Sequence, residues 1–209
     1  MSPLLIGFLG VLLVPLFAAS WRLSLVGLVG QGLIMAWISY RRDPAMDSIE
    51  AWVEMFDYLV VRGLGAPIAL YLVLRGQRAT GRHDVIPPNL MSWSLAIGLV
   101  FVGYRFGDHL VAVEGDAQTF VAVATTALLL GFLLLATQTG PFSQMVGALR
   151  IENGIALFGL GGPPDQEDLS LRIVQTALVI VTVILFRWYL QVLPREAVAK
   201  ASAVEGSAT

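Results

Sequence analysis

The sequence contains no cysteine, one lysine and two histidines, and only 13% of its 209 residues are charged. Without cysteine there is no disulfide, no thiolate-bound iron–sulfur cluster and no Cys-ligated zinc. The lysine, Lys200, falls in the expected C-terminal tail, so we expect no retinal-type Schiff base within a helix. The histidines, His83 and His109, fall in polar stretches between apolar runs, which argues against a bis-His haem held between helices.

What the sequence has in abundance is apolar side chains, which make up 56% of the chain. An ordinary soluble domain carries about 25% charged residues, so this chain has too few charges to cover a water-exposed surface. We therefore expect an integral membrane protein. The net charge of −2 argues against a nucleic-acid partner.

Apolar runs of the length of a transmembrane helix occur about seven times along the chain. The predicted spans are residues 3–19, 23–40, 49–75, 89–106, 118–137, 141–161 and 169–190. The connectors are short and rich in turn formers, and the alternation of a membrane β-barrel is missing. We expect an all-α polytopic helix bundle, with residues 1–194 as one transmembrane domain and residues 195–209 as a flexible C-terminal tail.

Basic residues are distributed unequally between the two sides of this predicted bundle. Three lie on the side of the N-terminus: Arg41, Arg42 and Arg105. Seven lie on the opposite side: Arg22, Arg75, Arg78, Arg82, Arg187, Arg195 and Lys200. The positive-inside rule assigns the more basic side to the cytoplasm, so we expect an N-out, C-in orientation. No basic residue precedes the first span, so we expect a retained helix rather than a cleaved signal peptide.

Ionisable side chains within the spans are candidates for function, because a charge in hydrocarbon costs at least a few kcal/mol. Glu152 lies near the middle of the sixth span and Arg62 near the middle of the third. Burial favours the neutral form of a carboxyl group and a nearby cation favours its charged form, so Glu152 is the candidate for proton exchange. Arg150 lies about 200° around the helix from Glu152, so Arg62 or a water chain is the better candidate partner. The alternative is a Glu152–Arg62 pair that only locks helix packing.

The third span combines charged residues with a helix-breaking sequence. Glu54, Tyr58 and Arg62 follow the i, i+4, i+8 spacing of an α-helix, which predicts one stripe on a helix face. Proline lacks the N–H that would continue the helical hydrogen bonds, so we expect a kink or local opening. The predicted break comprises Gly63, Gly65 and Pro67. Interrupted helices beside charged groups are typical of hydrated ion sites in membranes.

A plainer interpretation exists for the same residues. Glu50 and Glu54 fall in the outer part of the span, where they would cap the helix together with the N-cap candidates Asp47 and Ser48. Arg62 would form a buried structural ion pair with a carboxylate on a neighbouring helix.

Other polar and small residues are expected to support these groups. The polar supports are Gln31, Tyr58, Asn153 and Gln175, and the third span contributes a further carboxylate, Asp57. Arg150 and Arg172 are expected to extend toward the headgroups or to pair locally. Close helix contacts are expected at Gly27, Gly30, Gly32, Gly147 and Gly154. The histidines have no metal-ligand spacing and no phosphate-binding glycine loop is present, so we expect neither catalytic residues nor a metal site.

Three short segments occur in an order and spacing that resemble a known family. They are Ser20-Trp21-Arg22-Leu23-Ser24 leading to Gln31, the pair Arg62 and Pro67, and Arg150-Ile151-Glu152-Asn153-Gly154. Together they resemble hydrogenase 4 membrane component E, a subunit of the membrane arms of group 4 [NiFe] hydrogenases and formate hydrogenlyases. The resemblance covers about residues 20 to 190. It implies a fixed, non-catalytic member of a redox-driven, proton- or ion-translocating complex in the bacterial cytoplasmic (inner) membrane.

The last three helices of that family look like the three-helix K-type subunit of respiratory complex I, and here correspond to residues 118–137 and 141–190. In that subunit a mid-membrane glutamate belongs to a hydrated axis thought to carry protons, and Glu152 falls on its position. The resemblance implies antiporter-like membrane subunits and lipids as partners. It also implies that NiFe, iron–sulfur, flavin or quinone groups are bound by partner subunits rather than by this chain.

The chain departs from the family pattern at two places. The family usually has lysine where this chain has Arg62, and arginine stays protonated and cannot hand on a proton. Relatives carry a second mid-membrane carboxylate in the seventh span, where this chain has Gln175 and Thr176. Two alternatives therefore stay open: a free-standing transporter with its substrate at the break, residues 63–67, and a purely structural membrane anchor. No internal repeat supports the transporter.

Overall fold

The computed structural model describes residues 3–17, 21–76, 90–110, 115–137, 141–162 and 169–206. Several positions used in the sequence-based predictions lie outside these residues: Ser20, Arg78, Arg82, His83 and residues 207–209 of the expected tail.

Each predicted apolar run is helical over its described residues, and the described residues contain no strand. The elements are α1 (Pro3–Phe17), α2 (Trp21–Arg42), α3 (Ile49–Met55), η1 (Phe56–Gly65), α4 (Ala66–Gly76), α5 (Leu90–Leu110), α6 (Asp116–Thr137), α7 (Pro141–Gly161) and α8 (Leu169–Gly206). The expected third span is thus made of three consecutive elements, α3, η1 and α4. The all-helical fold predicted from the apolar runs is confirmed for the described residues.

Four helical stretches are long and apolar enough to cross a membrane: Trp21–Arg42, Ile49–Leu72, Asp116–Thr137 and Leu169–Tyr189. The chain is therefore a helical membrane protein. The stretch on α8 differs from the others because only 17% of it is buried within the chain, against 50% for α2. Its apolar surface faces outward, toward lipid or neighbouring protein.

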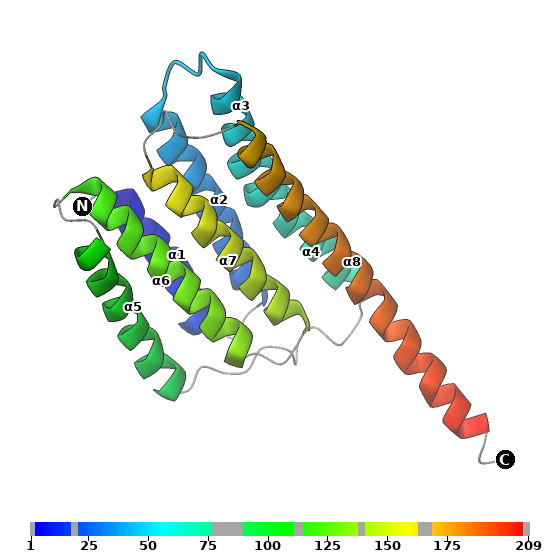
Figure 1. The fold of residues 1–209 in the computed structure, drawn as a ribbon. Coiled ribbons are helices and arrows are strands. Elements are labelled where there is room, and N and C mark those ends of the chain that lie inside the picture. Colours follow the sequence, from blue (N-terminus) through cyan, green and yellow to red (C-terminus); the bar gives the residue numbers. More distant parts are fainter. Residues whose placement is uncertain are drawn as a thin grey trace.

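The end of α8 differs from the sequence-based expectation of a tail that begins after residue 194. The helix continues to Gly206, so residues 195–206 extend it in the direction of its axis. Figure 1 shows this last part of α8 projecting beyond the other helices (Figure 1). Small residues and charged ones are compatible with helix here because alanine, glutamate and lysine are good helix formers.

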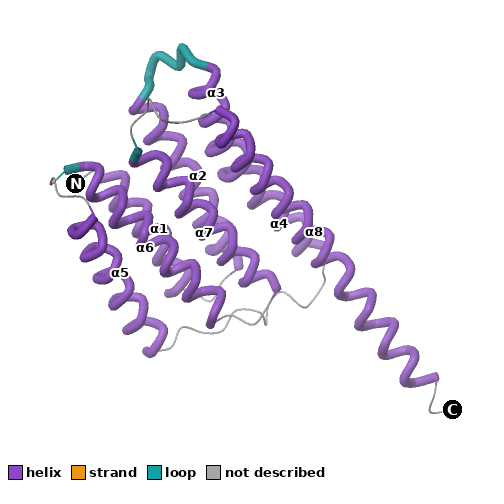
Figure 2. Tube along the Cα trace, in the orientation of Figure 1, coloured by secondary structure: helices purple, strands orange, loops and turns teal. Residues whose placement is uncertain are grey.

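The helices run side by side in a single bundle, with α5 at one edge and α4 with α8 at the other (Figures 1 and 2). In this arrangement α6 packs between α5 and α7, and α2 packs against α1, η1 and α7. The buried apolar side chains form two clusters, and α2, η1, α6 and α7 contribute to both. Residues from α2, η1 and α7 therefore meet inside the bundle.

The close approach of α2 and η1 depends on two glycines. A Cβ atom at Gly32 would lie 2.6 Å from the amide nitrogen of Gly63 and 2.8 Å from the carbonyl oxygen of Tyr58. A Cβ atom at Gly63 would lie 3.0 Å from the same Tyr58 oxygen. Glycine at both positions allows the backbones to touch, which brings the polar side chains of the two helices within reach of each other.

Candidate functional site

The expected interruption of the third span takes the form of a π-helix. Residues Phe56–Gly65 make hydrogen bonds of the i→i+5 type, and at its end the N–H of Ala66 bonds to the carbonyl oxygen of Val61. Pro67 follows directly and has no N–H to donate, which favours a change of hydrogen-bond pattern on its N-terminal side. The disturbance begins at Phe56, earlier than the glycines and proline suggest, and π segments are frequent at functional sites.

The widened helical turn pairs two charged residues that α-helical spacing separates. Arg62 Nε donates to Asp57 Oδ2 over 2.8 Å, and both side chains are buried. In an α-helix, residues five apart lie about 140° from each other around the axis, whereas the i→i+5 pattern of a π-helix places them on the same side. The expected stripe of Glu54, Tyr58 and Arg62 is therefore replaced by an Asp57–Arg62 ion pair within one helix.

The guanidinium group of Arg62 also reaches α7. Its Nη1 donates to the backbone carbonyl of Glu152 over 2.9 Å and to Asn153 Oδ1 over 3.3 Å. Asn153 in turn donates from Nδ2 to Gln31 Oε1 over 2.9 Å. Asp57, Arg62, Asn153 and Gln31 thus form one buried polar network, which joins η1, α7 and α2. Three of its members were expected only as separate supports or carboxylates, and the structure brings all four together.

The side chain of Glu152 is not part of this network. Its side chain is half-buried, and among the described residues its carboxylate makes neither a hydrogen bond nor a salt bridge, although its main-chain carbonyl accepts from Arg62. The carboxylate that neutralises Arg62 is Asp57, on the same helical element. The expectation of a structural pair between Arg62 and a carboxylate on a neighbouring helix is therefore wrong, because the π-helix supplies a nearer partner.

Two atoms of the buried polar network have no hydrogen-bond partner in the described part of the chain. They are Gln31 Nε2 and Asp57 Oδ1. A buried donor or acceptor left in this way costs about 1–3 kcal/mol, and such groups are commonly satisfied by water or an ion. The polar network therefore has the free hydrogen-bonding capacity that a hydrated site needs.

A second ion pair lies along the same helix, closer to its start. Arg172 Nη1 on α8 bonds to Glu54 Oε2 over 2.7 Å. Both residues line a polar cavity of about 430 Å³ at the end of the bundle where α2 joins α3; its other lining residues are Ser39, Arg42, Asp43, Ser48, Glu50 and Ala51. The other oxygen of Glu54, Oε1, is buried and has no partner among the described residues. Glu54 therefore holds α8 against α3 and is more than the helix-capping residue of the plainer interpretation.

The start of the third span does carry an N-cap as expected. Ser48 Oγ accepts a hydrogen bond of 3.1 Å from the N–H of Ala51. This cap satisfies an orphan donor of the first turn without Glu54, whose carboxylate pairs with Arg172.

The remaining sequence candidates are less closely tied to the polar network. Tyr58 is buried in the first apolar cluster and its carbonyl oxygen lies at the α2–η1 contact. Gln175 on α8 is half-buried, and no hydrogen bond joins it to the polar network. The helix-break residues Gly65 and Pro67 lie at the end of η1 and in the first turn of α4.

Sequence reasoning underestimated two arginines, Arg150 and Arg172. Arg150 is 2% exposed and donates from Nη1 to the backbone carbonyl of Leu12 on α1 over 3.2 Å. It is buried between helices and does not extend toward the headgroups. Arg172 pairs with a residue more than a hundred positions earlier, so its pairing is not local. Partners so far apart in the chain follow only from the helix packing, which one sequence does not reveal.

The chemistry available here is that of charges, hydrogen bonds and proton exchange. Within the described residues, no group of three or more histidine, aspartate or glutamate side chains is placed to hold a metal ion. A carboxyl group beside a fixed guanidinium and unsatisfied amide and carboxylate atoms can exchange a proton with water. Comparison of the chain with protein-family models, with curated proteins and with solved structures finds no match.

Proposed function

We propose that this chain is a non-catalytic membrane subunit of a complex-I-like or group 4 hydrogenase-like assembly that couples a redox reaction to proton translocation. In this proposal it crosses the bacterial cytoplasmic membrane seven times with its N-terminus outside, Glu152 exchanges protons, and redox cofactors are bound by partner subunits. The observation that carries the proposal is the buried polar network of Gln31, Asp57, Arg62 and Asn153 inside an apolar bundle.

The cost of the buried polar network is the first argument. Polar and charged groups inside a membrane are expensive and mark ion pathways and proton relays by default. If these residues served packing alone, apolar side chains would do so at a lower cost in stability. A buried ion pair often contributes no more to stability than an apolar replacement of similar volume. Unsatisfied atoms on Gln31 and Asp57 add to the cost and fit a path that contains water.

The division of roles follows from the chemistry of the two central groups. Arg62 stays protonated, so it does not carry protons itself; its charge is paired with Asp57, and it binds α7 at the main-chain carbonyl of Glu152. The carboxylate of Glu152 makes no hydrogen bond to the described residues, and the side chain is half-buried on α7. Only its main-chain carbonyl binds Arg62, so the carboxylate can change its protonation state without breaking the polar network. Gln175 and Thr176, in place of a second carboxylate, require water or hydroxyl groups to continue the path on α8.

The polar cavity at the start of α3 gives this path an outer end. It reaches Glu54, which lies one helical turn before Tyr58 and three residues before Asp57. Under the N-out orientation this end of the bundle faces the outside, so the cavity would connect external water to the polar residues of η1.

A purely structural anchor is the second candidate, and one observation favours it. Arg62 is held by three acceptors, Asp57, the carbonyl of Glu152 and Asn153, which is also what a static clamp between η1 and α7 requires. The two candidates differ in the role of Glu152. The relay needs its carboxylate, whereas a clamp uses only its main-chain carbonyl.

The first experiment is affinity purification of the tagged chain in mild detergent, with mass spectrometry of the proteins that co-migrate on a native gel. The proposal expects antiporter-like membrane subunits together with iron–sulfur or metal-containing subunits. A chain that migrates alone or as a small homo-oligomer contradicts it and favours a free-standing transporter.

The second experiment compares Glu152→Gln with Glu152→Asp in the purified assembly. The relay expects Glu152→Gln to abolish ion-coupled turnover while assembly stays intact, and Glu152→Asp, which keeps a titratable group, to retain part of it. Equal coupling in both variants and in the wild type contradicts the relay and supports the anchor.

A further inference from the structure

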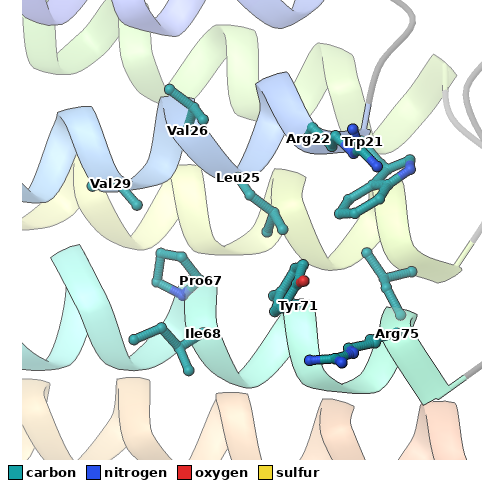
Figure 3. Close-up of a pocket in the computed structure, with 10 residues that line it drawn as sticks. Trp21, Arg22, Leu25, Val26, Val29, Pro67, Ile68, Tyr71 and Arg75 are labelled. Atoms are coloured by element: carbon teal, nitrogen blue, oxygen red, sulfur yellow. The ribbon is translucent and has the colours of Figure 1, made fainter.

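A groove of about 500 Å³ lies between the first half of α2 and α4, at the opposite end of the bundle from the polar cavity. Figure 3 shows its lining side chains (Figure 3). One end carries two arginines, Arg22 and Arg75, and two aromatic residues, Trp21 and Tyr71. The other end is apolar and is formed by Leu25, Val26, Val29, Pro67 and Ile68. The groove thus has a charged head and an apolar body.

We propose that this groove binds an anionic phospholipid, with the phosphate at Arg22 and Arg75 and an acyl chain along the apolar body. The proposal concerns a face of α2 and α4 that contributes nothing to the polar network, and it takes from the function proposed above only the N-out orientation that assigns the groove to a leaflet.

Charge complementarity is the first support. Among the described residues neither Arg22 nor Arg75 has a salt-bridge partner; the recorded interaction of Arg22 is with the ring of Trp21, at 5.2 Å from its centroid. Both side chains are exposed. Guanidinium groups match phosphate geometry and bind it with charge-assisted hydrogen bonds, so two of them at one mouth favour an anionic headgroup over a neutral one.

The aromatic pair marks the depth of the bilayer interface. Trp21 and Tyr71 lie with their ring centroids 6.2 Å apart across the two helices. Tryptophan and tyrosine are enriched at the membrane–water boundary, where their polar tips reach the headgroups. Both rings lie at the arginine end of the groove (Figure 3), the level at which a phospholipid's headgroup and glycerol region would lie.

The dimensions agree with one leaflet. From Trp21 to Val29 and from Pro67 to Arg75 the antiparallel helices each rise about 12 Å at 1.5 Å per residue. Half of a hydrocarbon core of about 30 Å is about 15 Å. An acyl chain can therefore follow most of the leaflet along the groove. With the N-terminus outside, this is the cytoplasmic leaflet, where anionic lipids attract basic residues.

The test uses the full chain in the assembly in which it purifies from mild detergent. Its apparent Tm is measured in micelles supplemented with phosphatidylglycerol, with phosphatidylcholine of the same chain length, or with inorganic phosphate. We expect phosphatidylglycerol to raise the Tm by roughly 5–10 °C, the shift given by a ligand near 100 times its Kd. Phosphatidylcholine and inorganic phosphate are expected to give little shift.

Three variants assign the effect to the groove. Arg22→Gln/Arg75→Gln is expected to abolish the preference for phosphatidylglycerol, and Val26→Trp, which fills the apolar body while keeping both arginines, is expected to weaken it. Arg187→Gln is the matched control, because Arg187 is also exposed and lies outside the groove. Native mass spectrometry should find phosphatidylglycerol retained by the wild type and by Arg187→Gln.

The proposal is overturned if phosphatidylglycerol and phosphatidylcholine give equal shifts, or if the double arginine variant keeps the preference. An equal shift from inorganic phosphate would also overturn it and leave a phosphate site without a lipid. Co-purification of a protein that protects the groove from lipid would assign the groove to a subunit contact instead.

Discussion

Asp57 and Arg62 are five residues apart on one helix, yet their side chains form a buried ion pair of 2.8 Å. This relationship exists because the helix between them is of the π type, which places residues i and i+5 on the same side. The pair uses Nε of Arg62 and leaves Nη1 to bind α7. A local change of helical hydrogen bonding thereby produces the contact between η1 and α7.

Removal of Arg62 should destabilise the bundle more than removal of the whole pair. Arg62→Met leaves Asp57 buried without a cation, and breaking a buried pair in this way costs about 3–5 kcal/mol. Asp57→Asn/Arg62→Met should recover part of that loss because no uncompensated charge remains. Unfolding of the purified variants in a denaturing detergent gives the free energies for this double-mutant cycle.

Arg187→Met, at an exposed position, is the control and should change the free energy of unfolding by no more than about 0.5 kcal/mol. A double variant that is as unstable as the sum of the two single variants would show that Asp57 and Arg62 do not depend on each other.

Gly32→Ala tests the close approach of α2 and η1. The new Cβ would lie 2.6 Å from the backbone nitrogen of Gly63, and backbone cannot move aside as a flexible side chain does. We expect a loss of about 1–3 kcal/mol, as for overpacking elsewhere. Gly98→Ala is the matched control, because nothing lies within 4 Å of the added atom and alanine is the better helix former by about 1 kcal/mol. Equal stability of the two variants in thermal unfolding would contradict the tight contact.

The positions of the helices could be predicted from the sequence with little loss. Apolar runs of about 20 residues separated by glycine, proline and charge leave few alternatives to helices. The predicted span 141–161 coincides with α7, and the predicted span 118–137 begins two residues after the start of α6 and ends with it. Ser48 was also a readable signal, because a serine just before an apolar periodic stretch is a common N-cap.

The residues of the site could be predicted from the sequence, but the contacts between them could not. Gln31, Arg62 and Asn153 stand out in sequence because polar residues are rare within spans, but their mutual hydrogen bonds depend on helix packing. The pairing of Asp57 with Arg62 could not be read from α-helical spacing, since that spacing separates them. Gly63, Gly65 and Pro67 indicated that the helix is interrupted. They did not indicate that the interruption is a π-helix or that it begins at Phe56.

Arg150→Met should behave differently from Arg62→Met. Arg150 is buried, donates to the carbonyl of Leu12, and its Nε and Nη2 atoms have no partner among the described residues. A methionine of similar length removes this burial cost, so stability should stay equal or rise, in keeping with apolar replacements of buried charges. Thermal unfolding of Arg150→Met and Arg62→Met under the same conditions compares their stabilities. A loss for Arg150→Met as large as that for Arg62→Met would show that a further acceptor, outside the described residues, satisfies the guanidinium.

The absence of cysteine from the chain makes thiol labelling a direct test of the polar cavity and of orientation. Ser39→Cys and Ala51→Cys place a thiol on the cavity wall at positions that are 4% and 7% exposed. Ala127→Cys is the control, at a position that is 0% exposed within the apolar core. If water fills the cavity, a charged, membrane-impermeant thiol reagent should label the two cavity variants roughly tenfold faster than the control, because the reaction needs a solvated thiolate.

Under the N-out orientation the labelling occurs in intact cells. Labelling only after the membrane is opened would reverse the orientation and leave the cavity in place. Equal, slow labelling of all three variants would mean that water does not reach Glu54, and the proposed outer end of the proton path would then be wrong.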